Sequence, residues 1–214
     1  MNIKKIVTKT YQENVYVYYD EASKVGAVID PGSDAKDIIK FLDETGLKIE
    51  YILLTHGHFD HIMAVKEVAA HTGAPVAAGV DERELLGSGT LNFAMEVYGT
   101  DYGVSVDVPL KDGDVLNVGG ARIKVLHTPG HTKGGVCFYD EAEGVLFSGD
   151  TLFHESIGRT DFPGGNMNTL DASIKSKIYT LPPQTLIYPG HMRMTTVEHE
   201  IKNNPFVNLA SSKA

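Results

Sequence analysis

The sequence predicts a mixed α/β fold in which strands alternate with helices. Two observations support this prediction. In the first third of the chain, short β-branched and aromatic runs alternate with segments of helical periodicity. From residue 107 onward the pattern is rich in strands, and helical periodicity returns only near the C-terminus. The chain is therefore expected to combine sheets and helices throughout.

The first half of the chain alternates strand and helix signals. Strands are predicted over residues 3–9, 14–19, 25–29, 51–54 and 75–78, and helices over residues 34–45 and 61–72. Ser33 is the expected N-cap of the first helix because its hydroxyl can accept a bond from a free backbone N–H group. Gly46 and Gly73 suit the left-handed conformation that ends many helices.

The middle segment, residues 81–103, is the least regular part, and we interpret it as an insertion or lid next to the functional site. In the second half, strands are predicted over residues 115–118, 121–126, 136–139, 145–147 and 185–188, and helices over residues 169–179 and 195–203. Asn168 or Thr169 is the expected cap of the first of these helices. No linker or low-complexity tract divides the sequence, so a single domain over residues 1–214 is predicted.

The composition of 42% apolar and 22% charged residues is ordinary for a soluble globular protein. A net charge of −9 argues against nucleic acid as a partner, since its phosphates require a basic patch. No apolar run approaches the roughly 18 residues that span a bilayer, and the N-terminus lacks the apolar core of a signal peptide. Cys137 is the only cysteine, so no intrachain disulfide can form. A cytoplasmic protein with a small-molecule partner is expected, and the sequence does not predict its oligomeric state.

The most informative motif is the run of residues 55–61, with three histidines and one carboxylate in six positions. In an extended segment, side chains two apart point the same way, so His56 and His58 can converge. Asp60 and His61 follow where the chain should turn into a helix. Imidazoles and carboxylates are ligands of zinc or iron(II), so we expect a metal site rather than a histidine-rich surface loop.

Three more candidate ligands share one local pattern: an apolar strand, then a glycine, then a ligand-type residue. They are His131, Asp150 and His191. The glycine permits a tight turn and a close approach of the backbone. Functional residues are often found on loops that a rigid scaffold positions, so we expect these three side chains to join the site.

With these residues in place, the sequence resembles the metallo-β-lactamase superfamily. The resemblance follows the chain in order through His56-Gly57-His58-Phe59-Asp60-His61, His131, Asp150 and His191. It implies a four-layer αββα sandwich, with two packed sheets, helices outside them and metals at one sheet edge.

The resemblance also implies a division of the ligands between two metals. The first metal would be bound by His56, His58 and His131, and the second by Asp60, His61 and His191. Asp150 would bridge them. Two divalent ions per chain are therefore expected, with zinc preferred and iron or manganese as alternatives.

Other segments indicate which branch of the superfamily the sequence resembles. Residues 148–153, 158–162 and 203–206 resemble the glyoxalase II and persulfide dioxygenase group. Asp150 argues against β-lactamases that carry a cysteine ligand at this place. Only 23 residues follow His191, so no separate C-terminal glutathione-binding helical domain is expected, and the chain is similar to short bacterial glyoxalase II-like hydrolases.

This resemblance implies hydrolysis of a thioester such as S-acylglutathione. Metal binding lowers the pKa of water from about 15.7 to about 7, which gives hydroxide at neutral pH. Asp60 is expected to orient that hydroxide. Arg159 is a candidate for binding a substrate carboxylate, or equally for an internal salt bridge, and His154 is a second candidate substrate contact. His199 is expected to be solvated.

Three alternatives stay open from the sequence. The main one is a mononuclear non-haem iron persulfide dioxygenase, in which two histidines and one carboxylate form a facial triad from His56, His131 and Asp150. The second is a lactonase or esterase. The third is a metal that only ties strands together, although structural zinc sites are usually rich in thiolates.

Overall fold

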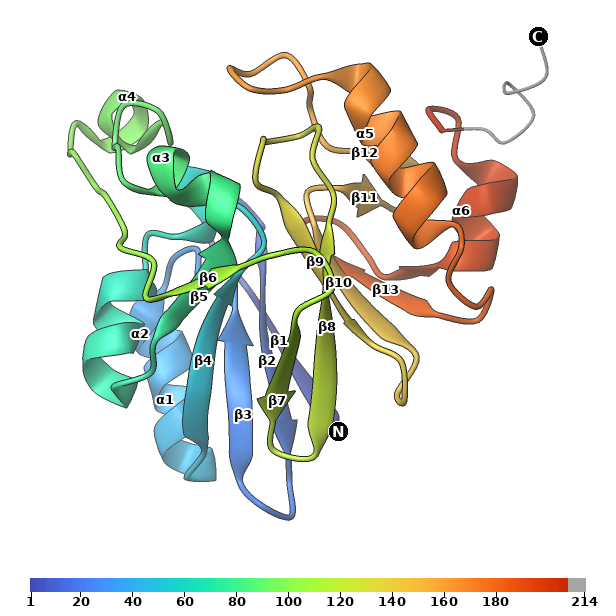
Figure 1. Ribbon diagram of the computed structural model, residues 1–214. Coiled ribbons are helices and arrows are strands. Elements are labelled where there is room, and N and C mark those ends of the chain that lie inside the picture. The colour runs from blue at the N-terminus through green and yellow to red at the C-terminus, as the bar shows by residue number, and fades with distance from the viewer. Residues whose placement is uncertain (208–214) are drawn as a thin grey trace, which may run out of the picture.

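The first of two six-stranded sheets in the computed structural model, which describes residues 1–207, is built from the N-terminal half of the chain (Figure 1). Its strands follow chain order: β1 (Asn2–Val7), β2 (Asn14–Asp20), β3 (Val25–Ile29), β4 (Lys48–Leu54), β5 (Val76–Gly79) and β6 (Val108–Leu110). The pairings β1–β2 and β2–β3 are antiparallel, whereas β3, β4, β5 and β6 pair in parallel.

The second sheet has the order β14-β13-β10-β9-β8-β7. Its strands are β7 (Val115–Val118), β8 (Ala121–His127), β9 (Val136–Asp140), β10 (Val145–Gly149), β13 (Leu186–Pro189) and β14 (Thr195–Thr196). β9 is antiparallel to both β8 and β10, and β13 is parallel to β10. β8, β10 and β13 therefore run in one direction and end at the same edge. A small hairpin, β11 (Leu152–Phe153) and β12 (Ser156–Ile157), follows β10.

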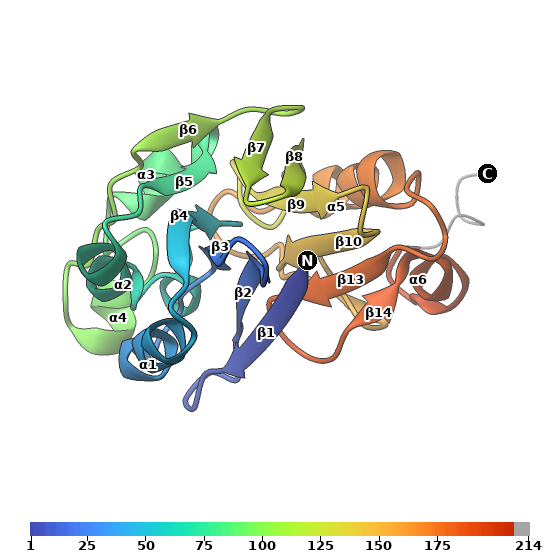
Figure 2. The same ribbon diagram turned by 90° about the horizontal axis from the view of Figure 1, so that it is seen from below.

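Helices cover the two outer faces of the paired sheets (Figure 2). α1 (Ala35–Thr45) and α2 (Val65–Thr72) lie on the first sheet. α5 (Met167–Ser173), its π-helical continuation Ile174–Ile178, and α6 (Val197–Asn203) lie on the second. The short α3 (Arg83–Leu86) and α4 (Ala94–Tyr98) belong to the irregular middle segment. The layers are the αββα arrangement that the sequence resemblance implied.

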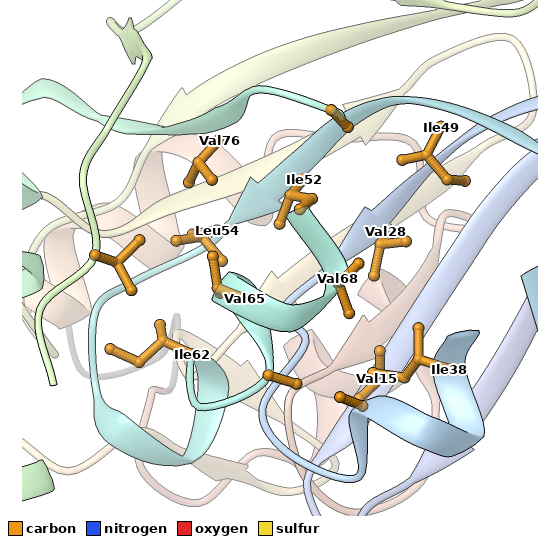
Figure 3. Packing of buried hydrophobic residues seen from close by; sticks show 14 of the residues in the cluster. Val15, Val28, Ile38, Ile49, Ile52, Leu54, Ile62, Val65, Val68 and Val76 are labelled. Atoms are coloured by element: carbon orange, nitrogen blue, oxygen red, sulfur yellow. The ribbon is translucent and has the colours of Figure 1, made fainter. Parts of the chain in front are cut away.

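The alternation of side chains along β2 shows how the layers separate. Val15 and Val17 point into the cluster between the first sheet and its helices, whereas Tyr16 and Tyr18 point into the cluster between the sheets. Successive side chains of a strand face opposite sides, so a strand buried on both faces is apolar throughout. Figure 3 shows the first of these clusters, where Ile52 and other strand residues pack against the helices.

β9 makes the same division on the second sheet. Val136 and Phe138 join the cluster between the sheets, and Cys137 and Tyr139 join the cluster under α5 and α6. Cys137 is fully buried, which confirms its interpretation as a small apolar core residue. Leu170 of α5 belongs to the same outer cluster.

The predicted N-cap of the first helix is wrong. Asp34 rather than Ser33 is the cap position, with a left-handed φ of 55° and no side-chain capping bond. A carboxylate oxygen of Asp34 instead accepts the backbone N–H of Lys9 at 2.8 Å. A contact 25 residues away thus replaces the local cap, whereas Gly46 ends the helix with φ 66° as predicted.

The helix predicted over residues 61–72 is interrupted. Phe59–His61 forms a 3-10 turn, and α2 begins only at Val65. The N–H group of Ala64 donates to the carbonyl of Pro31 at 3.0 Å rather than to a carbonyl of its own helix. Because Ala64 bonds to the loop after β3, the helix begins later in the sequence than predicted.

The C-terminal helices also begin at residues other than those predicted from the sequence. Asn166 caps α5, since its Oδ1 accepts the N–H of Thr169 at 2.9 Å, so Asn168 and Thr169 are not the cap. The helix predicted over residues 195–203 begins at Val197, because Thr195–Thr196 pairs with β13 as β14. The short strands β6, β11 and β12 were not predicted. Among residues 1–207, no helix combines the length and apolarity that crossing a membrane requires.

Phe138→Ala should test the interface between the sheets. Phe138 has no exposed surface, so its truncation is expected to lower the free energy of unfolding by about 3–5 kcal/mol. Val115→Ala, at a side chain that is 42% exposed, should cost less than about 1 kcal/mol. Chemical denaturation measures both, and equal losses would contradict this layer assignment.

Candidate metal centre

The predicted ligands meet at one edge of the sandwich, where four strands end. β4 leads into the loop of His56 and His58, β8 precedes His131, β10 precedes Asp150, and β13 precedes His191. Because β8, β10 and β13 run in one direction, their following loops lie together. The sandwich thus brings residues separated by up to 135 positions, 56 to 191, to one place.

One group of potential ligands consists of His56, His58 and His131, whose ring nitrogens lie within 4.8 Å of one another. Nδ1 of His58 is 2.9 Å from Nε2 of His131. Burial lowers the pKa of His58 to about 3 and holds the pKa of His56 well below its usual value. Both rings are therefore neutral at pH 7, and neutral imidazole is the form that binds a metal.

The second group consists of Asp60, His61 and His191, again with ligand atoms within 4.8 Å. Oδ2 of Asp60 lies 3.2 Å from Nε2 of His191 and 3.8 Å from Nε2 of His61. His61 is fully buried, and Asp60 and His191 are partly exposed. This group therefore faces the side of the site that solvent can reach.

Asp150 lies between the two groups. Its Oδ1 is 3.3 Å from Nε2 of His61, and its Oδ2 is 3.8 Å from Nε2 of both His131 and His191. Burial alone would raise the pKa of Asp150, but the charge of His61, whose Nε2 is 3.3 Å away, holds that pKa well below its usual value. Asp150 is thus an ionised carboxylate that reaches both groups.

Several buried polar atoms at this edge have no hydrogen-bond partner in residues 1–207. They include Nε2 of His56, Oδ1 of Asp150 and, 3.3 Å from that oxygen, Nε2 of His61. A buried polar atom left without a partner costs about 1–3 kcal/mol, so this arrangement calls for a ligand. In a tetrahedral zinc site, ligand atoms about 2.0–2.1 Å from the metal lie about 3.3 Å from one another. The spacings of 2.9–3.8 Å observed here bracket that value, so the residues fit divalent metal ions.

Asp30, which the sequence reasoning missed, supports this centre from behind. Its Oδ1 accepts the N–H of Thr55 at 2.7 Å, and its Oδ2 accepts the Thr55 hydroxyl at 2.6 Å. The same Oδ2 lies 3.1 Å from Nδ1 of His61. Such a carboxylate fixes the ring and leaves its other nitrogen free for a metal. Asp30 follows an apolar strand as Asp150 does, and that shared pattern is the signal that could have identified it.

Glu82 was also missed, and it joins two of the ligand loops. Its buried carboxylate accepts the N–H of Gly57 at 2.9 Å and the N–H of Gly134 at 2.8 Å. These glycines neighbour His58 and the loop of His131. Glu82 lies in the irregular segment and has no local pattern that distinguishes it from a surface glutamate, so only the tertiary structure identifies it.

The two predicted substrate contacts have other partners. The guanidinium of Arg159 bonds both carboxylate oxygens of Asp161, at 2.9 and 2.8 Å, which is the internal salt bridge considered as the alternative. The carbonyl of Arg159 accepts Nδ1–H of His131 at 2.7 Å and thereby directs Nε2 of that ring into the site. His154 lies in a separate cluster with Glu155 and His199.

An aromatic wall formed by Phe93 and Phe162 borders the first group. The His58 ring is 5.7 Å from the ring of Phe93 and 5.4 Å from that of Phe162, measured between centroids. The two phenylalanine rings are 4.6 Å apart. Phe93 belongs to residues 81–103, so this segment lies next to the site, as expected.

Comparison with known proteins agrees with this architecture. The sequence profile of a family described as the metallo-beta-lactamase superfamily matches residues 8–191. The chain is similar to a protein named hydroxyacylglutathione hydrolase GloC from Haemophilus influenzae, at 36% identity over 217 residues, covering 99% of this chain and 100% of that protein. It is also 40% identical over 182 residues to the probable metallo-hydrolase YqgX of Bacillus subtilis, covering 85% and 86% of the two chains.

Solved structures show the same fold. BLEG-1, described as a B3 metallo-beta-lactamase, superposes with a TM-score of 0.91 at 40% identity, covering 96% of this chain and 99% of the other. ETHE1 from Myxococcus xanthus superposes with a TM-score of 0.82 at 29% identity, covering 97% and 84%. TTHA1623, solved in a di-iron-bound form, has a TM-score of 0.82 at 36% identity, covering 95% and 99%.

Asp30→Asn should weaken metal binding. The amide loses the negative charge that supports His61, so metal affinity is expected to fall about 10- to 100-fold. Competition with a chromophoric chelator measures this loss. Asp43→Asn is the matched control, because Asp43 bonds His71 at 2.8 Å on the surface. An unchanged affinity in Asp30→Asn would show that Asp30 does not support the centre.

Glu82→Gln should loosen one of the two ligand loops. The amide nitrogen cannot accept a bond, so either Gly57 or Gly134 loses its acceptor, and the free energy of unfolding is expected to fall by about 1–3 kcal/mol. Glu84→Gln, an exposed neighbour, serves as control. Urea denaturation of both variants is the measurement, and equal stability would contradict the assigned bonds.

Proposed function

Because the chain belongs to the metallo-beta-lactamase superfamily of metal-dependent hydrolases, we propose that it cleaves a thioester, S-acylglutathione or a similar compound. The observation that carries this proposal is the pair of ligand groups on either side of Asp150. The similarity to GloC, which extends over the full length of both chains, supports the thioester.

In this proposal two divalent ions occupy the centre. His56, His58 and His131 bind the first, Asp60, His61 and His191 bind the second, and Asp150 bridges them. Zinc is the preferred ion, and the di-iron form of TTHA1623 supports iron as the alternative. Bound ions would supply hydroxide at neutral pH and polarise the acyl carbonyl.

The protein's own residues then orient the reactants. The Asp60 carboxylate is partly exposed, so it can accept a hydrogen bond from the attacking nucleophile and orient it. A thiol has an ordinary pKa of about 8.5, so the leaving thiolate needs little help from a general acid.

The surroundings of the centre favour a substrate with apolar parts. Phe93 and Phe162 form a wall beside His58 and reduce the access of water there. Exposed apolar side chains are also found on two segments close in sequence to the site: Leu91, Met95, Val97 and Tyr98 on one, and Met192 and Met194 on the other. Such surfaces commonly mark ligand or partner contacts.

The second candidate is a mononuclear iron dioxygenase acting on a persulfide. His56, His131 and Asp150 supply the two histidines and one carboxylate of a facial triad. The structural similarity to ETHE1 is compatible with this function. The two functions differ in their use of His191, which is a ligand only in the two-metal site.

Two assays of the purified protein separate the candidates. An S-acylglutathione should lose its thioester absorbance, and glutathione persulfide should cause no oxygen uptake at an electrode. A lactone, an ester and a β-lactam complete the panel, the last because of the similarity to BLEG-1. Oxygen uptake without thioester cleavage would overturn the proposal in favour of the dioxygenase.

His191→Ala should lower thioester cleavage at least about 100-fold, because it removes a ligand of the second ion. The matched control is His71→Ala, a surface histidine that pairs with Asp43 and belongs to neither ligand group, which should retain wild-type kcat/KM. Full activity in His191→Ala would contradict a two-metal mechanism.

A further inference from the structure

A second cluster of possible metal ligands lies outside the centre described above. It consists of His154 and Glu155, in the turn between β11 and β12, and His199 on α6. One ligand atom from each residue lies within 4.8 Å of the other two. We propose that this cluster is a peripheral binding site for a borderline divalent ion such as Zn²⁺, independent of the catalytic centre.

The geometry of the cluster suits such an ion. Oε1 of Glu155 lies 2.8 Å from Nε2 of His199 and 3.7 Å from Nε2 of His154. Ligand atoms around a tetrahedral zinc ion are about 3.3 Å apart, so both spacings are a few tenths of an ångström from the required value. The two imidazole rings are stacked, with centroids 4.8 Å apart and planes at 29°, and their Nε2 atoms face the same carboxylate.

The backbone of Glu155 is held in place by a buried acid. Glu200 has no exposed surface, and its Oε2 accepts the N–H of Glu155 at 2.9 Å. The same carboxylate accepts the hydroxyl of Thr195 at 2.6 Å and the side-chain amide of Asn204 at 2.9 Å. Glu155 adopts a left-handed φ of 53°, a conformation that a residue other than glycine keeps only when its surroundings fix it. The backbone of Glu155 is therefore fixed before any ion arrives.

Solvent can reach the cluster. The side chains of His154, Glu155 and His199 are 15%, 47% and 35% exposed. Three protein ligands with solvent beside them leave the fourth zinc position to water. Imidazole and carboxylate ligands bind zinc well, whereas a hard ion such as Mg²⁺ prefers oxygen ligands alone. The site is thus expected to select zinc and related transition metals.

Arg193 competes with the ion for this site. Its Nη2 lies 2.7 Å from Nε2 of His154, the nitrogen that a metal would need. Arg193 is exposed and can swing into solvent, but its bond and its positive charge both oppose an incoming cation. Removal of the guanidinium should therefore strengthen metal binding, which a merely structural role of the cluster would not produce.

Zinc titration of the metal-loaded protein tests the proposal. Equilibrium dialysis against micromolar Zn²⁺, followed by metal analysis, should show about one zinc per chain more in the wild type than in the double variant His154→Ala/His199→Ala. Glu155→Gln, a milder change, should weaken this zinc at least several-fold. Arg193→Gln should bind it several-fold more tightly. His71→Ala, a surface histidine that also pairs with a carboxylate, should match the wild type.

Equal zinc content in the wild type and the double variant would overturn the proposal, as would weaker binding in Arg193→Gln. Circular dichroism of each variant verifies that it is folded. If the double variant is unfolded, the zinc affinity of Glu155→Gln decides the test. The readout is bound zinc rather than turnover, so the outcome does not depend on whether the thioester proposal is correct.

Discussion

Three buried polar atoms at one sheet edge, Nε2 of His56, Nε2 of His61 and Oδ1 of Asp150, form no hydrogen bond within residues 1–207, although the last two lie 3.3 Å apart. Leaving such atoms unpaired costs free energy, and the folded protein tolerates them because the surrounding structure fixes their positions. Burial keeps His56 and His58 neutral, while the charge of His61 holds Asp150 ionised. Neutral nitrogens beside an ionised carboxylate form a site that attracts a divalent cation, and the proposed function depends on this arrangement.

The rest of the fold supplies the rigidity that this arrangement requires. Three apolar layers fix the strands, and the parallel direction of β8, β10 and β13 places the ends of these strands at one edge. Two buried carboxylates then position the loops: Asp30 bonds Thr55 and His61, and Glu82 bonds Gly57 and Gly134. Loss of a hydrogen-bond partner behind a metal ligand typically lowers metal affinity about 10- to 100-fold.

Much of the fold and of the site could be predicted from local patterns. Val25–Ile29 and Val115–Val118 have the bounds predicted from the sequence, because strands of these lengths depend on their own residues and on the strands that pair with them. The seven predicted ligands follow apolar strands, and the structure brings all seven together. Helix starts were less predictable, since Asp34 bonds Lys9 and Ala64 bonds Pro31 across the fold. Glu82 and the partners of Arg159 also depend on tertiary contacts that a sequence pattern does not contain.

The division of the centre into two metal sites is the central claim, and anomalous diffraction from a crystal of the protein tests it most directly. Data collected at the absorption edges of zinc and iron should show two peaks at this edge of the sandwich. One peak should lie among His56, His58 and His131, the other among Asp60, His61 and His191, with Asp150 between them. A single iron peak bound by His56, His131 and Asp150, with nothing beside His191, would contradict the two-metal account.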